Sequence, residues 1–467
     1  MLSTIINAIS SFLYSKLLVI MLIGTGLYFT VRARFPQLRL FRSACKAVME
    51  KPEDDQSVSS FQALMVSTAS RVGTGNIVGV SSAICIGGFG AVFWMWIIAI
   101  VGSASAFVES TLAQIYKKKG EDGRCYGGPA YYIEAALHSR PLAIAFCIAM
   151  ILTYAFGFNM LASYNLQSTF SGFSFYNPSV SPWIIGGILA VVTGWCLLGG
   201  GSRIVKVTST LVPVMGIAYI AVALLVVILN IANIPMVFAT IFREAFDFRA
   251  IFGAFAGSAL MQGIRRGLYS NEAGIGSAPN AAASAHVSHP VKQGLVQMLS
   301  VFIDTLLLCT ATAMMCMSSG IEPSAELQGA PWVQASLQAS LGSFGPVFIT
   351  VSMVLFAFTT LLGNCFYCDN LLTYIHKEQP GKRFMAGFRL VCAIVVFVGA
   401  GMEMSMLWDI SDVLMGVMAL INIPVILVLS NTAMKAVKDY EKQLKNGGNP
   451  VFRSTNIGLK HATDYWK

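Results

Sequence analysis

Residues 69–80 read ASRVGTGNIVGV and residues 270–279 read SNEAGIGSAP, and these two stretches decide the fold. Each stretch lies within an apolar segment long enough to cross a bilayer, yet each combines glycine with Asn, Ser or Thr. A glycine inside a helix costs about 1 kcal/mol relative to alanine, so both stretches predict a break. Within hydrocarbon, unpaired backbone groups are tolerated only where they line a polar cavity or contact a ligand. We therefore expect two broken membrane helices beside a binding site.

The composition of the whole chain excludes most soluble classes of protein. Of the 467 residues, 55% are hydrophobic and only 11% are charged, whereas about 25% are charged in a typical soluble domain. So few charges cannot cover the surface of a water-soluble fold of this length. A soluble multi-domain enzyme, a disordered chain and a secreted disulfide scaffold are excluded, and an integral membrane protein remains.

Eleven segments are predominantly apolar over about 20 residues, the length that a helix needs to span a bilayer. They cover residues 12–32, 60–86, 88–116, 141–168, 183–200, 207–230, 251–283, 290–318, 344–376, 384–401 and 404–430. The chain is thus predicted to be an all-α integral membrane protein with eleven transmembrane helices, joined by connections too short for a soluble domain.

Basic residues gather in alternate connections between these segments. The basic connections are 33–59, 117–140, 201–206, 284–292, 377–383 and the tail from residue 431. Connections 169–182, 319–343 and 402–403 carry no Lys or Arg, and only Arg243 and Arg249 depart from the pattern. Because Lys and Arg mark cytoplasmic connections, we expect a multi-pass plasma (inner) membrane protein with its N-terminus outside and its C-terminus in the cytoplasm. Topology then explains the net charge of +9, and no nucleic-acid partner is expected.

The two broken segments occupy corresponding places in the chain. If the first span is an extra helix, the breaks fall in core helices one and six, which implies two five-helix halves inserted with opposite orientation. We expect residues 1–59 to form the extra helix and its connection, 60–230 the first repeat, 231–430 the second repeat, and 431–467 a cytoplasmic tail. Paired breaks in inverted repeats indicate the binding site of a secondary transporter.

The chemistry of a broken helix indicates which ligands it binds. Free N–H groups at a half-helix N-terminus suit a carboxylate, and Thr74, Gly75 and Asn76 supply such groups. Unwound carbonyls suit a small cation, and the candidates are those of Ala69 and Val72. Glycines so close together leave little room for a substrate side chain, which favours a small amino acid.

Several long motifs make the chain resemble the alanine or glycine:cation symporter family, also called the sodium:alanine symporter family. They are GTGNIVG from Gly73, GGFGAVFWMWIIA from Gly87, GGPAYYIEAAL from Gly127, RGLYSNEAGIGSAPNAAA from Arg266 and HPVKQGLVQM from His289. The resemblance implies a LeuT-like core of ten helices, with discontinuous core helices one and six, plus one extra N-terminal helix. It also implies sodium-driven uptake of alanine, glycine or a similar small neutral amino acid. Some relatives handle D-alanine or glutamine.

The resemblance also implies where substrate and sodium bind. It places the substrate carboxylate at Thr74 to Asn76 and a sodium ion between core helix one and two hydroxyls of core helix eight, here Thr359 and Thr360. Two departures from the family pattern put the preferred substrate in doubt. Asn165 follows Ala162-Ser163-Tyr164 where many relatives have Gln-x-Asn, and Asn364 stands where several relatives have Trp. Together with Gly274 of the second break, these two asparagines complete the predicted substrate site.

Three polar residues at membrane depth are candidates for coupling or gating, because such residues are usually functional or paired. They are Asn271, Glu272 and Asp304. Glu272 is expected to pair with Arg265 or Arg266, to contact substrate or ion, or to titrate during transport. Asp304 is expected either to hold the polar end of core helix six or to serve the coupling ion. In a proton-coupled alternative, the two carboxylates matter most.

The other charged or titratable side chains are expected to have structural or solvent-exposed roles. Glu109 is expected to pair with Lys117 or another basic residue, Asp412 to lie near the outer surface, and His286 and His289 to be solvated. The sequence contains no H-E-x-x-H or G-x-S-x-G motif, so an enzyme is not predicted. A channel is disfavoured because a single-chain inverted repeat indicates a carrier. The expected partners are sodium, a small amino acid and the lipid bilayer, with no obligate protein partner evident.

Overall fold

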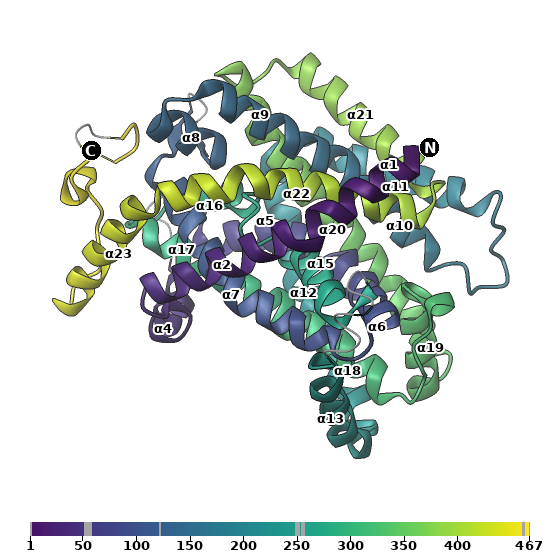
Figure 1. The fold of residues 1–467 in the computed structure, drawn as a ribbon. Coiled ribbons are helices and arrows are strands. Elements are labelled where there is room, and N and C mark those ends of the chain that lie inside the picture. Colours follow the sequence, from purple (N-terminus) through teal and green to yellow (C-terminus); the bar gives the residue numbers. More distant parts are fainter. Residues whose placement is uncertain are drawn as a thin grey trace.

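The protein is described by a computed structural model that places residues 2–50, 58–120, 123–247, 253, 257–459 and 463–466. Most of these residues are helical, and the strands β1 (Lys118–Lys119) and β2 (Cys125–Tyr126) form a short antiparallel pair. The longer helices, labelled in Figure 1, are α1 (Leu2–Phe12), α2 (Leu18–Arg32), α4 (Phe41–Val48), α5 (Ser60–Arg71), α6 (Val80–Gly87), α7 (Ala91–Ile115), α8 (Pro129–Leu137), α9 (Arg140–Ile151), α10 (Asn159–Ser168), α11 (Ser181–Leu198), α12 (Gly200–Leu229), α13 (Ile234–Ala245), α15 (Ala259–Asn271), α16 (Ala278–Ser284), α17 (Pro290–Val301), α18 (Thr310–Ser318), α19 (Ala330–Leu341), α20 (Phe344–His376), α21 (Lys382–Ala400), α22 (Met404–Val428) and α23 (Ser430–Lys445).

Eight helical runs are long and apolar enough to cross a membrane, within the part of the chain that the structure describes. Each coincides with a predicted segment, which confirms a mostly helical protein with many spans. The remaining predicted segments fall short of a long uninterrupted helix for identifiable reasons. The segments 60–86 and 251–283 are the broken ones, and α2 has 15 residues. The predicted start of the seventh segment lies outside the described residues, and the total of eleven spans stays a prediction.

Both predicted breaks are present. The first half-helix, α5, begins at a capping box in which the Ser59 side chain accepts from the N–H of Gln62, and it ends at Arg71. The chain resumes in the π-helical segment η2 (Gly75–Gly79), which continues into α6. The second break separates α15 from α16, and there the chain turns through positive φ angles at Glu272 (52°), Gly274 (86°) and Gly276 (90°). Glycine adopts such angles at no steric cost, which explains the sequence of this stretch.

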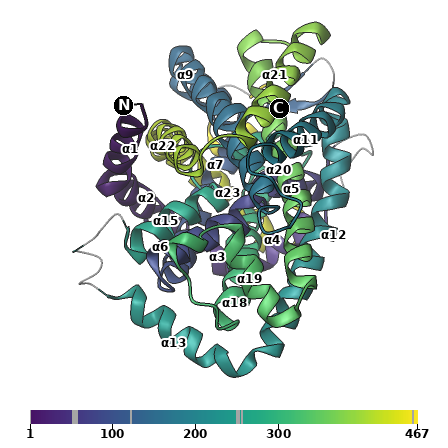
Figure 2. The ribbon, with the colours of Figure 1, turned by 90° about the vertical axis from the view of Figure 1, so that its right-hand side faces the viewer.

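The half-helices lie inside the molecule. α7 packs against α2, α15, α16 and α17, and α20 packs against α5, α10, α12 and α19. In both Figure 1 and Figure 2, α13 and α21 lie at opposite edges, and α5, α15 and α20 lie between them. The two broken helices are therefore surrounded by other helices, as their polar residues require.

Several connections contain helices that their composition did not predict. Residues 201–206 were predicted to form a basic loop but belong to α12, which begins at Gly200. The connections 117–140, 231–250 and 319–343 contain α8, α13 and α19. These three helices have only 9 to 12 residues, too short for the long apolar run that marks a span, which is why hydropathy misses them. The tail that was predicted from residue 431 begins within α23, a helix of 16 residues.

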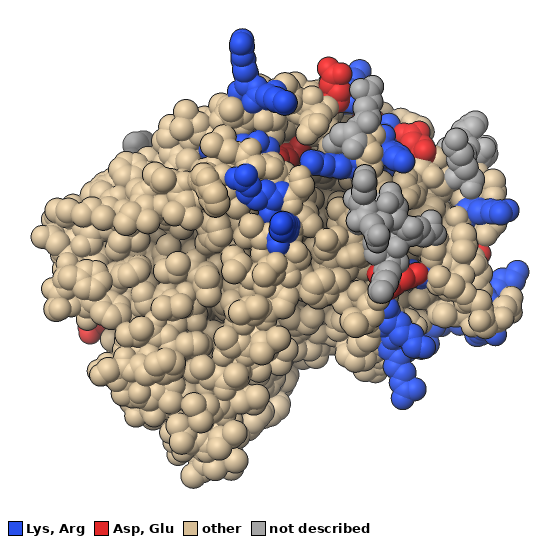
Figure 3. Space-filling model, turned by 180° about the vertical axis from the view of Figure 1, so that it is seen from behind, with Lys and Arg blue, Asp and Glu red and all other residues tan. Residues whose placement is uncertain are grey.

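Lys and Arg side chains cover one end of the molecule. Seen from behind in Figure 3, they lie over the upper and right-hand parts of the surface, and the left-hand part is almost free of them. The right-hand part in this view corresponds to the side of Figure 1 that carries α4 and α23. We call the side of the molecule that carries α4 and α23 the basic end. The distribution of charge matches the alternation of basic connections along the sequence.

The predicted solvation of His286 and His289 is wrong. The side chain of His289 is fully buried, its Nδ1 atom accepts from the N–H of Val291 at the start of α17, and its Nε2 atom lies 3.4 Å from Asp439 of α23. Burial lowers the pKa of His289 to about 3, so the ring is neutral at physiological pH. His286 is half-buried, and its ring lies 6.0 Å from that of Tyr465. The contacts come from the C-terminal segment, about 150 residues away in the sequence.

Replacing Gly363 by alanine is expected to force α20 and α5 apart. A Cβ on Gly363 would lie 2.7 Å from the backbone nitrogen of Ser70 and 3.0 Å from its Cα, and backbone cannot yield as a flexible side chain does. We expect Gly363→Ala to lower the free energy of unfolding by about 1–3 kcal/mol, measured by thermal unfolding in detergent. Gly216→Ala is the matched control, because a Cβ there would meet nothing within 4 Å among the described residues. Equal losses in the two variants would contradict this packing.

Candidate substrate and ion site

Asn76 replaces a helix hydrogen bond that is lost at the first break. In an uninterrupted helix the N–H of Gly73 would donate to the carbonyl of Ala69. Here that N–H donates to Oδ1 of Asn76 at 2.9 Å. The carbonyl of Ala69 therefore loses its helical partner at the place where the sequence predicts a cation-binding oxygen.

Asp304 joins the first break to two other elements. It lies in η6 (Phe302–Cys309), and its side chain is fully buried. Its Oδ1 accepts from Nδ2 of Asn76 at 2.8 Å, and its Oδ2 accepts from the hydroxyls of Ser270 and Thr305, each at 2.8 Å. The carboxylate thus ties η2 and α15 to η6. These contacts agree with a structural role for Asp304 in holding core helix six.

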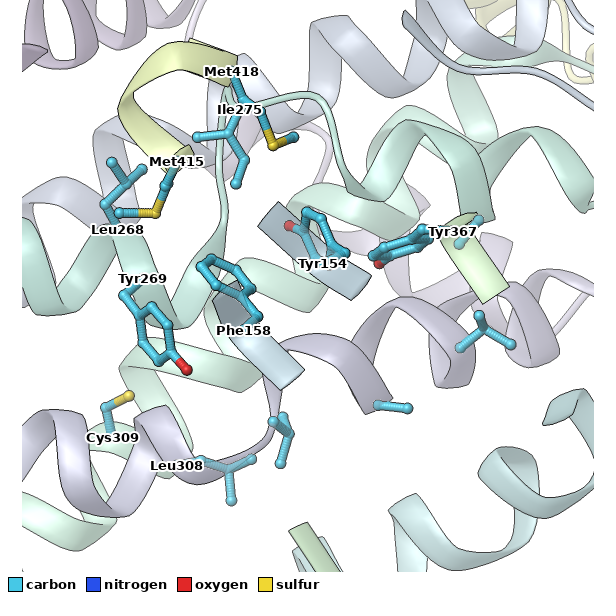
Figure 4. Packing of buried hydrophobic residues seen from close by; sticks show 14 of the residues in the cluster. Tyr154, Phe158, Leu268, Tyr269, Ile275, Leu308, Cys309, Tyr367, Met415 and Met418 are labelled. Carbon is cyan, nitrogen blue, oxygen red and sulfur yellow. The ribbon is translucent and has the colours of Figure 1, made fainter. Parts of the chain in front are cut away.

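Thr74 and Asn165 meet beside the first break. Nδ2 of Asn165 in α10 donates to Oγ1 of Thr74 at 3.0 Å, and Oδ1 of Asn165 is buried with no partner among the described residues. The ring of Tyr269 also covers this place, since a Cβ on Gly75 would lie 2.8 Å from its Cε1. Tyr269 packs edge-on against Phe158, with ring centroids 4.9 Å apart, as Figure 4 shows. The backbone of the first break is therefore flanked by the side-chain amide of Asn165 and by the ring of Tyr269, which packs against that of Phe158.

Glu272 links the second break to α5 and α20. Its side chain is buried, and its Oε2 accepts from the hydroxyl of Ser277 at 2.7 Å. The hydroxyl of Ser70 lies 3.3 Å from Oε1 of Glu272 and 2.8 Å from Oδ1 of Asn364. One hydroxyl carries a single hydrogen, so the shorter contact is the donated bond. Asn364 in turn donates to Asn159 at 2.9 Å. Asn364 thus bonds Ser70 of α5 and Asn159 of α10, and none of the described hydrogen bonds joins it to Thr74 or Asn165.

Gly274 is held by two side chains from other helices. Its N–H donates to Oε1 of Glu109 at 3.2 Å, and its carbonyl accepts from Nδ2 of Asn422 at 2.9 Å. Asn422 also donates to Oε2 of Glu109 at 2.8 Å. Of the two expected kinds of partner for Glu109, Lys117 donates instead to the carbonyl of Ala285, and the basic residue that acts on Glu109 is Arg71. Gly274 contacts α7 and α22 rather than the Thr74–Asn165 pair.

Arg71, the last residue of α5, is a buried cation close to three buried carboxylates. It acts electrostatically on Glu109, Glu272 and Asp304, and its Nη1 donates to the hydroxyl of Ser300. Burying unpaired charges is expensive. A guanidinium whose charge acts on all three carboxylates offsets part of that cost.

Arg265 and Arg266 do not pair with Glu272. Nη2 of Arg266 lies 2.7 Å from Oδ2 of Asp412, and Nη1 of Arg265 lies 4.0 Å from the same oxygen. The guanidinium of Arg266 also stacks 4.0 Å from the ring centroid of Trp408. The side chain of Asp412 is fully buried at this pairing, and its expected position near the outer surface stays a prediction. These charges form a second group, joining α15 to α22.

The two threonines predicted to bind sodium have different surroundings. Oγ1 of Thr359 lies 2.9 Å from the carbonyl of Leu355 and 3.1 Å from that of Phe356, so it bonds back to its own helix. Oγ1 of Thr360 is buried and has no hydrogen-bond partner in the described part of the chain. A Cβ on Gly73 would overlap this oxygen. Thr360 therefore faces the first break, and Thr359 does not.

The remaining predicted residues lie at the ends of the half-helices. Val72 donates its N–H to the carbonyl of Thr68 at 2.6 Å. Asn271 accepts from the N–H of Ala273 at 3.0 Å, and its Nδ2 is buried without a partner in the described ranges. Their roles in ion binding or gating stay predictions.

Sequence reasoning missed several residues that hold the breaks. They are Ser70, Asn159, Tyr269, Ser270 and Asn422. Each of the four Ser and Asn residues is polar within an apolar helix, which is the signal that could have found them. Tyr269 carries no such signal, because aromatic residues are common in every span.

Similarity to proteins of known sequence shows the family to which the chain belongs. A family model described as "Sodium:alanine symporter family" matches residues 1–454. The chain is 46% identical over 462 residues to "Amino-acid carrier protein AlsT" of Bacillus subtilis (strain 168), covering 98% of this chain and 97% of that protein. It is 41% identical over 466 residues to "Probable sodium/glutamine symporter GlnT" of the same organism, covering 99% and 95%.

One solved structure shows the fold. The structure of MhsT in complex with L-phenylalanine matches with a TM-score of 0.57 at 13% identity, covering 83% of this chain and 93% of that one. At this level of identity the likeness concerns the fold alone. It supports the LeuT-like fold that the family resemblance implies.

Replacing Asn422 by alanine is expected to weaken the second break. The variant leaves the carbonyl of Gly274 and the carboxylate of Glu109 without this buried donor. We expect Asn422→Ala to lower the free energy of unfolding by about 1–3 kcal/mol, measured by thermal unfolding in detergent. Asn446→Ala, at the exposed end of α23, is the control and should be near neutral. An unchanged melting temperature for Asn422→Ala would show that other groups hold the break.

Proposed function

The chain belongs to the sodium:alanine symporter family, and we propose that it imports a small neutral amino acid, such as alanine or glycine, together with sodium by alternating access. The observation that carries this proposal is the meeting of the first break with two buried oxygens. Oγ1 of Thr360 and Oδ1 of Asn165 both lack partners within the described residues. Buried polar atoms normally have partners, so a ligand that supplies them accounts for the arrangement.

The substrate is proposed to bind at Thr74, Gly75 and Asn76. Its carboxylate would take backbone N–H groups of the break, and its ammonium would donate to the oxygen of Asn165, which is an acceptor. The ring of Tyr269 lies against Gly75 and leaves space only for a small side chain. Gly274 is proposed to contribute through the second break, to which it belongs, and Asn364 through its hydrogen bond with Ser70 of α5.

Sodium is proposed to bind between α5 and α20. Its ligands would be the carbonyls of Ala69 and Val72 and the hydroxyl of Thr360, all of which are oxygens. Thr359 is left out of this proposed ligand set because its Oγ1 lies 3.7 Å from Sδ of Met215 in α12, on the side away from Gly73. Sodium at this place would order the broken backbone and so favour substrate binding. By linkage, substrate must then raise the affinity for sodium by the same factor.

We further propose the orientation and repeat structure that the sequence predicts. The basic end faces the cytoplasm of the cell, in agreement with its Lys and Arg side chains (Figure 3), and the N-terminus lies outside. Residues 60–230 and 231–430 form the two inverted halves around the breaks. Under this orientation α5 and α16 are the cytoplasmic halves of the broken helices.

Uptake into proteoliposomes tests the proposed function. Radiolabelled alanine and glycine are expected to accumulate only when an inward sodium gradient is present and not when potassium replaces sodium. Alanine flux without sodium would contradict sodium coupling. Uptake driven by a pH gradient would favour the proton-coupled alternative, in which Glu272 and Asp304 carry the proton. Stronger uptake of glutamine or D-alanine than of alanine or glycine would correct the substrate.

The two threonines of α20 provide a matched pair of variants for the sodium site. Thr360→Ala is expected to raise the sodium concentration for half-maximal uptake at least about tenfold, which corresponds to about 1.4 kcal/mol of binding free energy. Thr359→Ala should change it less than about twofold, because that hydroxyl is satisfied within its own helix. The measurement is initial uptake as a function of sodium concentration at saturating substrate. Equal effects of the two variants would show that the ion lies elsewhere.

A further inference from the structure

The C-terminal segment after α23 folds back over the basic end of the molecule. Its described residues are 446–459 and 463–466, and we call them the strap. In Figure 1 the strap is the yellow segment beside α23. Two groups of contacts attach the strap to residues that follow α16 and α7, and neither group belongs to the proposed substrate or sodium site.

The first anchor lies between α16 and α17. The N–H of Phe452 donates to the carbonyl of Ser288 at 2.8 Å, and the hydroxyl of Ser288 donates to the carbonyl of Pro450 at 2.7 Å. The ammonium of Lys292 donates to Oδ1 of Asn449 at 2.7 Å. The ring of Phe452 packs 5.2 Å from that of His289. These reciprocal bonds fix the path of the strap.

The second anchor is a pair of aromatic residues near the end of the chain. The ammonium of Lys117 lies 3.8 Å from the ring centroid of Tyr465 and 5.1 Å from that of Trp466. Nε1 of Trp466 donates to the carbonyl of Gln114 at 2.7 Å. Burial lowers the pKa of Lys117 to about 8, so the ammonium is still mostly charged at pH 7 and attracts both rings.

The residues under the second anchor hold the end of α16. Lys117 donates to the carbonyl of Ala285 at 2.8 Å, and Nε2 of Gln114 donates to the same carbonyl at 2.9 Å and to that of Ala282. These carbonyls are at the C-terminal end of a helix, where a cation and amide donors stabilise them. Trp466 therefore lies beside the ammonium of Lys117 and bonds the backbone of Gln114, and the side chains of these two residues clamp α16 to the end of α7.

The same clamp extends to the first half-helix. The N–H of His286, just after α16, donates to the carbonyl of Val58, just before α5, at 2.9 Å. A movement of α16 at this end would therefore also move the start of α5. These are the two half-helices that lie at the basic end.

A cavity of about 630 Å³ lies on another side of these half-helices. Its wall includes Gln62 of α5 and Ser284 of α16, which face Ser209 of α12 and Thr373 of α20. Exposed residues such as Lys206 line its mouth. To close this cavity, α16 and the start of α5 would have to approach α12 and α20, and the carbonyls of α16 would then leave the clamp at α7.

We propose that the strap is a conformational latch, which holds α16 against α7 and thereby stabilises the conformation in which the cavity at the basic end is open. Displacing Trp466 exposes Lys117 and Gln114 to water, which competes for their bonds to α16. The population then shifts toward the closed cavity. Any event that lifts the strap would shift the transporter in the same direction.

Alkylation of a cysteine in the cavity tests the latch. Ser209→Cys places a thiol on α12, which the strap does not touch among the described contacts, in a Cys45→Ser background because Cys45 is exposed. The purified full-length protein in detergent is treated with a charged maleimide, and the rate at this thiol is measured relative to the background. Adding Trp466→Ala is expected to slow alkylation at least about fivefold, the lower end of typical coupling between sites.

Matched variants separate the proposed latch from a general effect of mutating the strap on the alkylation rate. Val451→Ala removes an exposed side chain from the same segment and should leave the rate unchanged. Trp466→Phe keeps a ring near Lys117 but loses the donor to Gln114, so it should give an intermediate rate and serves if Trp466→Ala does not fold. Lys117→Met should act like Trp466→Ala. An unchanged or faster rate in the folded Trp466 variants would overturn the latch. The assay needs neither amino acid nor sodium, so its failure is distinct from failure of the proposed transport.

Discussion

Peptide groups that lie inside a membrane without a helix to pair them must find other partners, and this constraint organises the centre of the protein. Each unpaired group costs several kcal/mol in hydrocarbon, as an approximate guide. Asn76 bonds the N–H of Gly73, and Glu109 with Asn422 binds both polar groups of Gly274. Asn76 belongs to the same break as Gly73, whereas Glu109 and Asn422 come from helices far from Gly274 in the chain. Breaking two helices therefore requires the whole bundle to be assembled around them.

Buried charged side chains in the centre of the protein also need partners from other helices. Arg71 ends one half-helix and lies among three carboxylates, two of which hold the breaks through hydrogen bonds to Asn76 and Gly274. Arg266 and Asp412 form a separate buried pair that joins α15 to α22. Removing one member of such a group leaves a buried charge uncompensated, which is far more costly than the net gain from the pair.

The proposed ion site and the proposed latch are linked by continuous elements. α5 ends beside Thr360 at the first break and begins next to Val58, which the segment after α16 binds. α20 carries Thr360 and Asn364 near the breaks and Thr373 at the cavity. Because helices move as stiff units, a change at either end of α5 or α16 is transmitted to the other. The strap contacts this system through Trp466, which bonds Gln114 beside the residues that hold the end of α16.

The sequence by itself determined the class of protein, the long helices and both breaks, because hydropathy and glycine clusters act locally and leave their mark in consecutive residues. It also predicted that Thr74 and Asn165 belong to one site, through the family resemblance. Only the tertiary structure decided which polar groups meet. Arg266 binds Asp412 instead of Glu272, His289 is buried under Phe452, and Gly274 contacts Glu109. Thr359 and Thr360 are neighbours, yet a helix turns about 100° per residue, so one hydroxyl faces the break and the other its own helix. Contacts between residues hundreds of positions apart depend on how the helices pack, and no local pattern records that.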